Sequence, residues 1–202
     1  MRSSKLSPRT GIGKPAVLKA AGDLADEIGL ENVSIAAIAK KIGVKAPSMY
    51  NYLEGLESLR RELSLLGLSV LTERLTGASI GKSGFDLLHS VAEAQKDMTL
   101  ERPGLYSVSV AANTPGDEEL NALWQGPVRI FRAVIQSYGI EGEEGDHATR
   151  VLRTSVHGFA LVNSIDGFRL GADPDQTFER LVASIHHSLS EWNQVSNRSS
   201  VS

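Results

Sequence analysis

The side chains best suited to contact another molecule gather between Lys45 and Tyr52. Asn51 can form paired hydrogen bonds with adenine, and Ala46 or Pro47 can press on a thymine methyl group. Cationic, hydroxyl and phenol groups suit phosphate oxygens, and here they belong to Lys45, Ser48, Tyr50 and Tyr52. The segment therefore predicts contacts with the bases and with the backbone of double-stranded DNA.

Ser34 adds a contact from the start of a preceding helix. It stands just before Ile35, Ile38 and Ile42, which repeat at helical spacing, so we expect it to be an N-cap. Its hydroxyl and the free backbone N–H groups of the first turn suit another phosphate. The complete set of predicted DNA contacts is Ser34, Lys45, Ala46, Pro47, Ser48, Tyr50, Asn51 and Tyr52.

Such contacts need two short helices that are fixed at a steep angle by a turn and by a few apolar anchors. The stretch from Ser34 to Leu53 supplies each part and predicts a helix-turn-helix with Gly43 in the turn. The expected buried scaffold is Ile38, Ala39, Ile42, Val44, Met49 and Leu53. A small three-helix packing unit without a DNA-binding role is the alternative interpretation.

The charge distribution favours the DNA interpretation, although the 202-residue chain has a formal net charge of −3. Residues 1–65 hold ten Lys and Arg against seven Asp and Glu, whereas the remainder holds eleven against seventeen. A basic N-terminal part on an acidic body is typical of a small module that touches phosphates while the rest of the protein stays clear of them.

Helices are predicted throughout, because no segment alternates apolar and polar residues over the length of a strand. The expected helices cover residues 15–28, 35–42, 46–53, 56–75, 85–100, 103–112, 118–138, 146–168 and 174–193. The predicted fold is all-α, with an N-terminal three-helix head followed by a larger helical domain. The predicted ranges are a flexible basic arm (1–14), the helix-turn-helix DNA-binding domain (15–55), a ligand-binding and dimerisation domain (56–196) and a disordered tail (197–202).

Other chemistries have little support. The chain has no Cys, which excludes disulfides and thiolate metal sites and fits a cytoplasmic location. His186 and His187 are adjacent and therefore point about 100 degrees apart on a helix, so no metal site is expected. Gly77 and Gly81 are too close together for a nucleotide phosphate loop. We also expect no cofactor and no enzymatic activity. No membrane partner is expected either, since no apolar run reaches the roughly 20 residues that a membrane-spanning helix needs.

The N-terminal part resembles the TetR family of bacterial transcriptional regulators. Tyr52 stands where the family usually has histidine, and Leu56 stands where it usually has a phosphate-contacting lysine. Arg60 or Arg61 is a weak candidate substitute for that lysine. The resemblance covers about Pro15 to Leu63 and is carried by Ser34, Ile38-Ala39, Gly43-Val44 and Tyr50-Asn51-Tyr52-Leu53.

The remainder resembles the TetR-like C-terminal domain that is named for a Trp-His-Gly motif. The resemblance is carried by 102–106, 138–140 and 153–162, with Val156 in place of the tryptophan, and by Gly167-Phe168. It implies a homodimer with a four-helix interface and a ligand pocket in each protomer. The expected pocket residues are Phe85, His89, Tyr106, Trp124, Phe131 and His157, and the expected interface residues are Val156, Phe159, Phe168, Phe178, Ile185 and Leu189.

Both sets have a plainer interpretation. Aromatic residues at helical spacing are more often core than pocket, and the apolar stripes of the last two helices also suit a monomeric bundle. Taken together, the residues and the resemblance predict a ligand-responsive repressor that binds a near-palindromic operator as a homodimer and responds to an unknown small-molecule effector. An activator that contacts RNA polymerase fits the same residues. The competing class is an all-α small-molecule-binding protein or enzyme with a vestigial helix-turn-helix.

Overall fold

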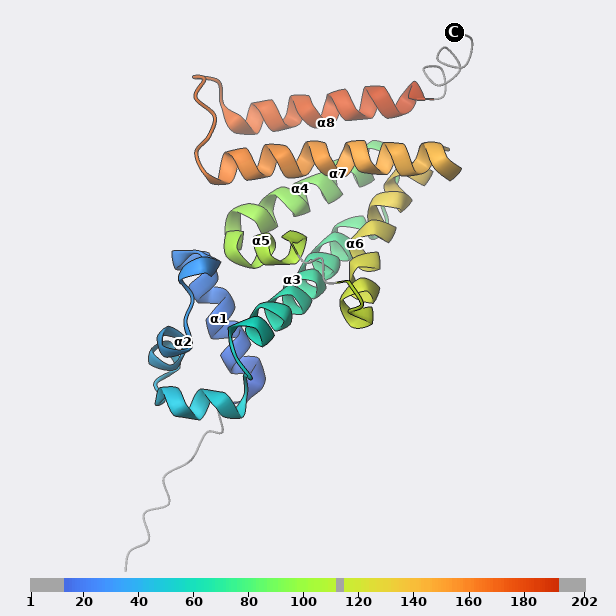
Figure 1. Cartoon of the computed structure of the whole chain (residues 1–202). Helices are drawn as coiled ribbons and strands as arrows, with labels where there is room; N and C mark the ends of the chain where they lie inside the picture. Colours follow the sequence, from blue (N-terminus) through green and yellow to red (C-terminus); the bar gives the residue numbers. More distant parts are fainter. Residues whose placement is uncertain (1–12, 112–114, 193–202) are drawn as a thin grey trace, which may run out of the picture.

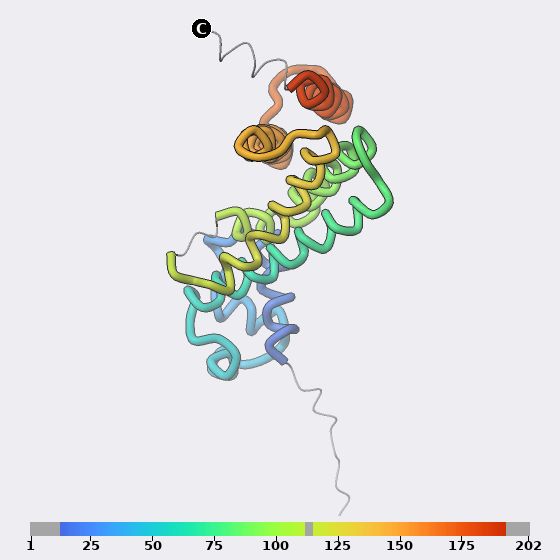
Figure 2. The backbone as a smooth tube through the Cα atoms, turned by 90° about the vertical axis from the view of Figure 1, so that its right-hand side faces the viewer, coloured from blue at the N-terminus to red at the C-terminus, as the bar shows by residue number. Residues whose placement is uncertain are grey.

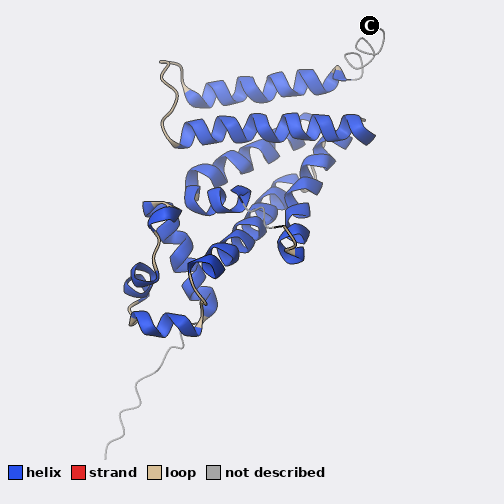
Figure 3. Cartoon of the chain, viewed as in Figure 1, coloured by secondary structure: helices blue, strands red, loops and turns tan. Residues whose placement is uncertain are grey.

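The computed structural model describes residues 13–111 and 115–192, and the regular structure in these ranges is entirely helical (Figure 3). The predicted all-α fold is confirmed. The predicted arm (1–14), except for its last two residues, and the predicted tail (197–202) lie outside the described residues. The elements are α1 (Lys14–Ile28), η1 (Leu30–Asn32), α2 (Ile35–Ile42), η2 (Ala46–Asn51), α3 (Leu56–Ser79), α4 (Gly84–Glu101), α5 (Pro103–Ala111), α6 (Glu118–Gln136), α7 (Gly142–Ser164) and α8 (Pro174–Ser190).

The helices form three tiers (Figure 1). The head, which consists of α1, α2 and η2, occupies one end, and α7 and α8 run antiparallel across the other end. Helices α3 to α6 lie between, and α3 leads from the head into this middle tier. A view turned by 90° shows α7 and α8 nearly end-on above the middle tier (Figure 2). None of the described helices has both the length and the apolar character that are needed to cross a membrane.

The predicted start and end of α2, the first helix of the helix-turn-helix, are confirmed. The Ser34 hydroxyl oxygen accepts a hydrogen bond from the Ala37 N–H (3.2 Å), and Gly43 ends α2 in the left-handed conformation (φ +74). The following helix is of a different type from the one predicted, because η2 is a 3-10 helix that ends at Asn51. Short segments commonly adopt this tighter form, and here the Ser48 N–H bonds to the Lys45 carbonyl (2.9 Å).

The bounds of two other helices differ by four residues from the sequence-based expectation. Helix α3 continues to Ser79, and α7 begins at Gly142 rather than at residue 146 and ends at Ser164 rather than at 168. Glu143 and Glu144 lie in the first turn of α7, where carboxylates interact favourably with the free N–H groups, which offsets the low helix propensity of the glycines.

The hydrophobic core of the head extends beyond the predicted domain boundary at residue 55. It is built on Val17, Ala21, Ile38 and Met49, together with apolar residues of α3 and α5. The contributing α3 and α5 side chains are Leu59, Leu63, Leu105 and Val108. The head is therefore packed onto the middle tier through a shared core.

The second core contains most of the residues that were predicted for the dimer interface. Five of the six predicted interface residues are buried within the chain itself, and the sixth, Phe168, packs on Phe159 with ring centroids 5.0 Å apart. Phe159 also contacts Phe178 at 5.1 Å. These side chains therefore pack within one protomer, and their role in a dimer stays a prediction. The predicted interface residues are Val156, Phe159, Phe168, Phe178, Ile185 and Leu189.

Candidate DNA-contact surface and internal cavity

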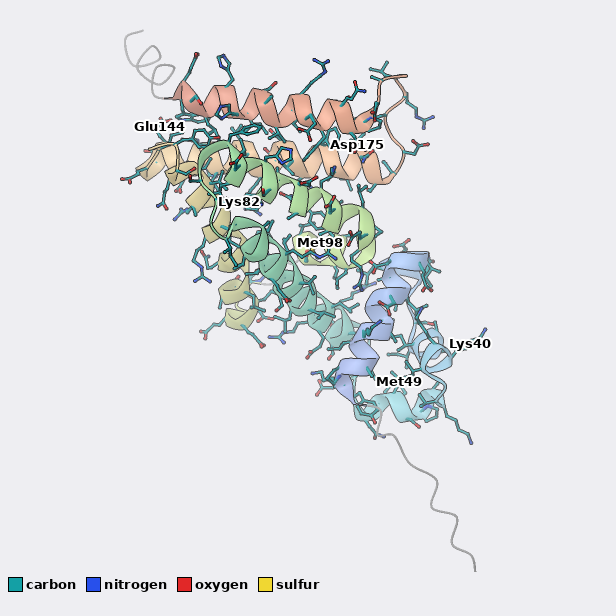
Figure 4. The ribbon with its side chains drawn as sticks, turned by 180° about the vertical axis from the view of Figure 1, so that it is seen from behind. Lys40, Met49, Lys82, Met98, Glu144 and Asp175 are labelled. Atoms are coloured by element: carbon teal, nitrogen blue, oxygen red, sulfur yellow. The ribbon has the colours of Figure 1, made fainter. Side chains whose placement is uncertain are left out.

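The segment from Ser34 to Leu53 has a buried inner side and a polar outer side. Met49 and Leu53 are 0% and 1% exposed, whereas Tyr50 between them is 67% exposed. Figure 4 labels Met49 in the head, at the end farthest from α7 and α8. Two of the predicted contacts, Ala46 and Tyr52, are half-buried. The other six predicted contacts are exposed: Ser34, Lys45, Pro47, Ser48, Tyr50 and Asn51.

Cations free to meet phosphates lie on this outer side. Lys45 and Lys40 are exposed, and neither forms an ion pair with a residue that the structure describes. Lys40 extends away from the head in Figure 4. Its neighbour Lys41 is held by Glu27, with 2.6 Å between Nζ and Oε1. Lys40 was missed as a candidate contact, although its position on the polar face of α2 was a usable signal.

The structure separates the two arginines that were considered as substitutes at Leu56. Arg61 binds the N-terminal end of α6, with its Nε 2.6 Å from Asp117 and its Nη2 2.7 Å from Glu119. The Arg61 guanidinium holds the pKa of the Asp117 carboxyl below its usual value. Arg61 is therefore occupied, whereas Arg60 is exposed and forms no ion pair among the described residues.

Helix α5 joins the head to the body through a polar cluster. Arg102, just before α5, donates hydrogen bonds to Asp23 (3.2 Å) and to Asp26 of α1. The other carboxylate oxygen of Asp26 accepts from the Leu105 N–H (3.0 Å), so it satisfies one of the free N–H groups at the start of α5. The Asp26 carboxylate of the head thus holds Arg102 in place and caps the N-terminal end of α5.

Gly104 brings the two helices unusually close at this joint. A Cβ atom at this position would lie 2.2 Å from the backbone C and O atoms of Ala25. Glycine is the residue that allows backbone to approach backbone at this distance. The start of α5 is therefore pressed directly against α1.

A cavity of about 250 Å³ lies in the body, between α3, α4, α5, α6 and α7. Four of the six predicted pocket residues line it, namely Tyr106, Trp124, Phe131 and His157. The other two lie elsewhere, because Phe85 stacks on His89 and the His89 ring bonds to Glu179 of α8 (3.0 Å). The rest of the lining is Leu68, Leu71, Gln95, Val110, Pro127, Arg150, Arg153 and Thr154.

A chain of hydrogen bonds crosses one wall of this cavity. The Gln95 Nε2 donates to the Tyr106 hydroxyl (2.8 Å), which lies 2.9 Å from Nδ1 of His157. Burial, with Arg153 nearby, lowers the pKa of His157, so its neutral form is favoured. The donor in the contact between Tyr106 and His157 depends on the tautomer of the imidazole ring.

The sequence interpretation missed Arg153, a half-buried cation that lines the cavity. Its guanidinium lies over the Trp124 ring, 4.8 Å from the centroid, and 5.9 Å from the centroid of Phe131. Burial lowers the pKa of Arg153. A signal was present, since Arg150, Arg153 and His157 share one face of a helix by their spacing of three and four residues.

A buried helix-turn-helix scaffold with a polar outer side, on an all-helical body, defines a helix-turn-helix regulatory protein. Comparison with known proteins agrees. Residues 17–63 match the family described as "Bacterial regulatory proteins, tetR family", and residues 88–185 match "Tetracyclin repressor-like, C-terminal domain". The chain is 31% identical over 169 residues to the uncharacterised HTH-type transcriptional regulator YobS of Bacillus subtilis (strain 168), covering 83% of this chain and 87% of that protein. The chain belongs to the TetR family and is a transcriptional regulator.

Further relatives agree in sequence or in fold. An uncharacterised HTH-type transcriptional regulator of Mycobacterium tuberculosis is 28% identical, with 85% of this chain and 78% of that protein covered. A protein of unknown function from Rhodococcus sp. RHA1 superposes with a TM-score of 0.78 at 15% identity, covering 91% and 100% of the two chains. A TetR variant from Acinetobacter baumannii AYE in complex with minocycline gives 0.66 at 18%, covering 90% and 98%. At these identities the structural likeness concerns the fold alone.

Proposed function

We propose that this regulator is a homodimeric, ligand-responsive repressor that binds a near-palindromic operator in the cytoplasm. The observation that carries the proposal is the exposed polar surface of η2, which lies directly over the buried anchors Met49 and Leu53. We also propose the narrower Trp-His-Gly subclass for the C-terminal part, supported by the adjacent His157 and Gly158.

In the proposed complex, η2 and the end of α2 face the major groove. Asn51 reads adenine, and the exposed Tyr50, Ser48 and Lys45 reach phosphates. Lys40 and Arg60 extend the phosphate contacts, since both are exposed cations without an ion pair among the described residues. Arg60 then supplies the charge that Leu56 lacks.

Helix α5 supports a route from the cavity to the head. Tyr106 of α5 lines the cavity, while the adjacent Leu105 belongs to the core of the head and Gly104 contacts α1. Because α5 packs against α1, a ligand that displaces α5 also displaces α1 and with it the head. The ligand weakens DNA binding only if it prefers the non-binding geometry, and a tenfold preference corresponds to about 1.4 kcal/mol.

The proposed dimer forms on the outer face of α7. This face, the α7 stripe, is turned away from Leu152 and Phe159, which are buried in the core. Leu161 and Ile165 are 47% and 71% exposed, and a Cβ at Gly158 would meet no atom within 4 Å, so a second helix can approach closely. The α7 stripe consists of Val151, Thr154, Gly158, Leu161, Val162 and Ile165. The proposed occupant of the stripe is the same stripe of a second copy of the chain. A two-fold axis through this contact would give the dimer two heads, one for each half-site of the operator.

The DNA-binding proposal is tested by selecting bound sequences from a random DNA pool and then measuring variants on the selected site. We expect a near-palindrome. Tyr50→Ala should weaken binding to every sequence, and Asn51→Ala should relax preference at one base pair by about 1–3 kcal/mol. Unchanged binding by both variants would refute the proposed groove contacts.

The charge contacts have a matched control. Lys45→Ala should weaken binding and reduce the salt dependence by about one phosphate contact in each half-site, which for the dimer is a change in slope of about 1.8. Arg129→Ala removes the same charge from an exposed site on α6 and should leave both quantities unchanged. A salt response that is the same in the two variants would exclude Lys45 from the interface.

A further inference from the structure

The body cavity holds a cation that has no counter-charge. Arg153 is half-buried, and no carboxylate lies within ion-pair distance of it in the parts of the chain that the structure describes. No Asp or Glu of the described residues lines the cavity, whereas Arg150 also lines it. A half-buried charge without a counter-charge is unfavourable because it has lost part of its hydration. An anion in the cavity would remove this penalty.

The orientation of Arg153 indicates what kind of anion fits. One flat face of its guanidinium is covered by the Trp124 ring, with 4.8 Å from Cζ to the ring centroid. The in-plane N–H groups then remain for the ligand, and a planar guanidinium pairs with a carboxylate through two parallel hydrogen bonds. A singly charged carboxylate is favoured over a phosphate, since transferring a second charge into this largely apolar space would cost more.

Gln95 supplies a second, independent indication of a ligand. Gln95 is 4% exposed and lines the cavity, and its Oε1 has no hydrogen-bond partner among the residues that the structure describes. The amide is held by its other end, which donates to Tyr106 (2.8 Å). A buried acceptor without a donor is rare and destabilising in a folded protein. A hydroxyl or N–H group on the ligand would satisfy it.

The remaining wall is apolar and partly aromatic. Leu68 and Leu71 of α3, Pro127 and Phe131 of α6 and Val110 of α5 surround a space of about 250 Å³. This volume is slightly below the usual range for ligand pockets, roughly 300–1,000 Å³. The cavity therefore admits only a small molecule, about the size of a single aromatic ring with a short substituent.

We propose, building on the regulator function proposed above, that the effector is a small organic acid with a carboxylate that pairs with Arg153 and a flat apolar body that carries a hydrogen-bond donor for Gln95. The carboxylate pairs with Arg153 in the part of the cavity that His157 also lines. The body lies against Trp124 and the leucines of α3. Ligand binding thereby acts on α3 and α5, the two helices that share their core with the head.

The test uses the full-length protein and a small set of probes, with calorimetric titration and thermal unfolding as readouts. The probes are 4-hydroxycinnamate, its uncharged amide 4-hydroxycinnamamide, and cinnamate, which lacks the hydroxyl donor. We expect 4-hydroxycinnamate to bind most tightly and to raise the unfolding temperature most. Equal affinity for the acid and the amide would overturn the proposal, and so would the absence of any acid binding at millimolar concentration.

Two variants locate the binding groups. Arg153→Met keeps an apolar stem over Trp124 and should weaken acid binding by about ten- to a hundredfold, while binding of the amide is retained. Gln95→Leu should remove the preference of 4-hydroxycinnamate over cinnamate. Arg129→Met on the exposed surface of α6 is the control and should change neither. If Arg153→Met binds the acid as tightly as the unmodified chain does, the carboxylate is not where we place it.

The readouts separate this proposal from the regulator function. Binding of the ligand-free protein to the selected operator is measured in parallel, and Arg153→Met should retain it. Acid binding without any effect on operator affinity would refute ligand-responsive regulation and leave the ligand class standing. Operator binding that responds only to an uncharged compound would refute the ligand class and leave the regulator standing.

Discussion

Replacing Gly104 by alanine perturbs the joint between the head and the body at one atom. The added Cβ would lie 2.2 Å from the backbone of Ala25, and non-bonded carbon atoms settle at about 3.5 Å, so α1 and α5 must separate by about 1.3 Å. Both obstructing atoms belong to backbone, and no side-chain rotation can relieve the overlap. The shift also stretches the hydrogen bond from the Leu105 N–H to Asp26, which is 3.0 Å long.

The expected effect is a loss of stability together with a loss of DNA affinity. Overpacking of this kind lowers the free energy of unfolding by about 1–3 kcal/mol. The better helix propensity of alanine offsets at most about 1 kcal/mol of this loss. Because α1 carries the helix-turn-helix, its displacement should also weaken operator binding by the ligand-free protein.

The matched control is Gly77→Ala in the last turns of α3, where a Cβ would meet nothing within 4 Å. Its free energy of unfolding should stay the same or rise by up to about 1 kcal/mol. Urea unfolding and operator titration measure both variants. If Gly104→Ala matches the control in stability and in operator affinity, the close contact between α1 and α5 does not hold the head.

Three further outcomes follow from the same structure. Phe178→Ala should lower the free energy of unfolding by about 3–5 kcal/mol, since Phe178 is 1% exposed in a single chain; dissociation of a dimer without this loss would return the residue to the interface. Gly158→Glu should leave the protomer folded and shift sedimentation toward the 21.7 kDa monomer, whereas Gly77→Glu should not; an unchanged dimer would remove the α7 stripe from the interface. The folded-state pKa of His157 lies below its ordinary 6.5, so its contribution to stability is complete above that pH and is lost as the pH falls below it. The unfolding temperature of His157→Gln should therefore decline less between pH 7 and pH 5 than that of the unmodified chain, and parallel curves would contradict the assignment.

The helix-turn-helix could be predicted from the sequence because its determinants are local. Ser34 caps the start of α2 and Gly43 ends it, while Met49 and Leu53, four residues apart, are buried in the core of the head. Each of these roles follows from neighbours along the chain. The outer side of η2 follows from the inner side by periodicity. The 3-10 form of η2 did not follow, since it depends on how the short segment is fitted between α2 and α3.

The dimer residues could not be predicted in the same way. An apolar stripe shows that a helix face is covered, but it does not show whether the same chain or another one covers it. Phe159 and Phe178 turned out to meet each other within one protomer (5.1 Å). The exposed residues Leu161 and Ile165 lie on the opposite face of α7, and only the packing of α4 and α8 distinguishes the two faces.

The cavity was predicted in part. Tyr106, Trp124, Phe131 and His157 lie on three helices that meet only in the folded chain, and aromatic character alone pointed to them. The same criterion also selected Phe85, which does not line this cavity and instead contacts the His89 ring. Arg153 escaped notice because charged residues are usually solvated, and its burial beside Trp124 depends on the position of α6.

The shared core of head and body bears on the construction of chimeric regulators. A head joined at Gly55 to the body of another regulator would lack Leu59 and Leu63. Its core residues would instead pack against whatever residues replace Leu105 and Val108 in that body. Exchange of DNA specificity between relatives therefore requires a junction within α3 after Leu63, together with the matching surface of α5. A chimera with its junction after Leu63 keeps the core that couples the head to the body. A chimera with its junction at Gly55 has a head and a body whose contact surfaces do not match.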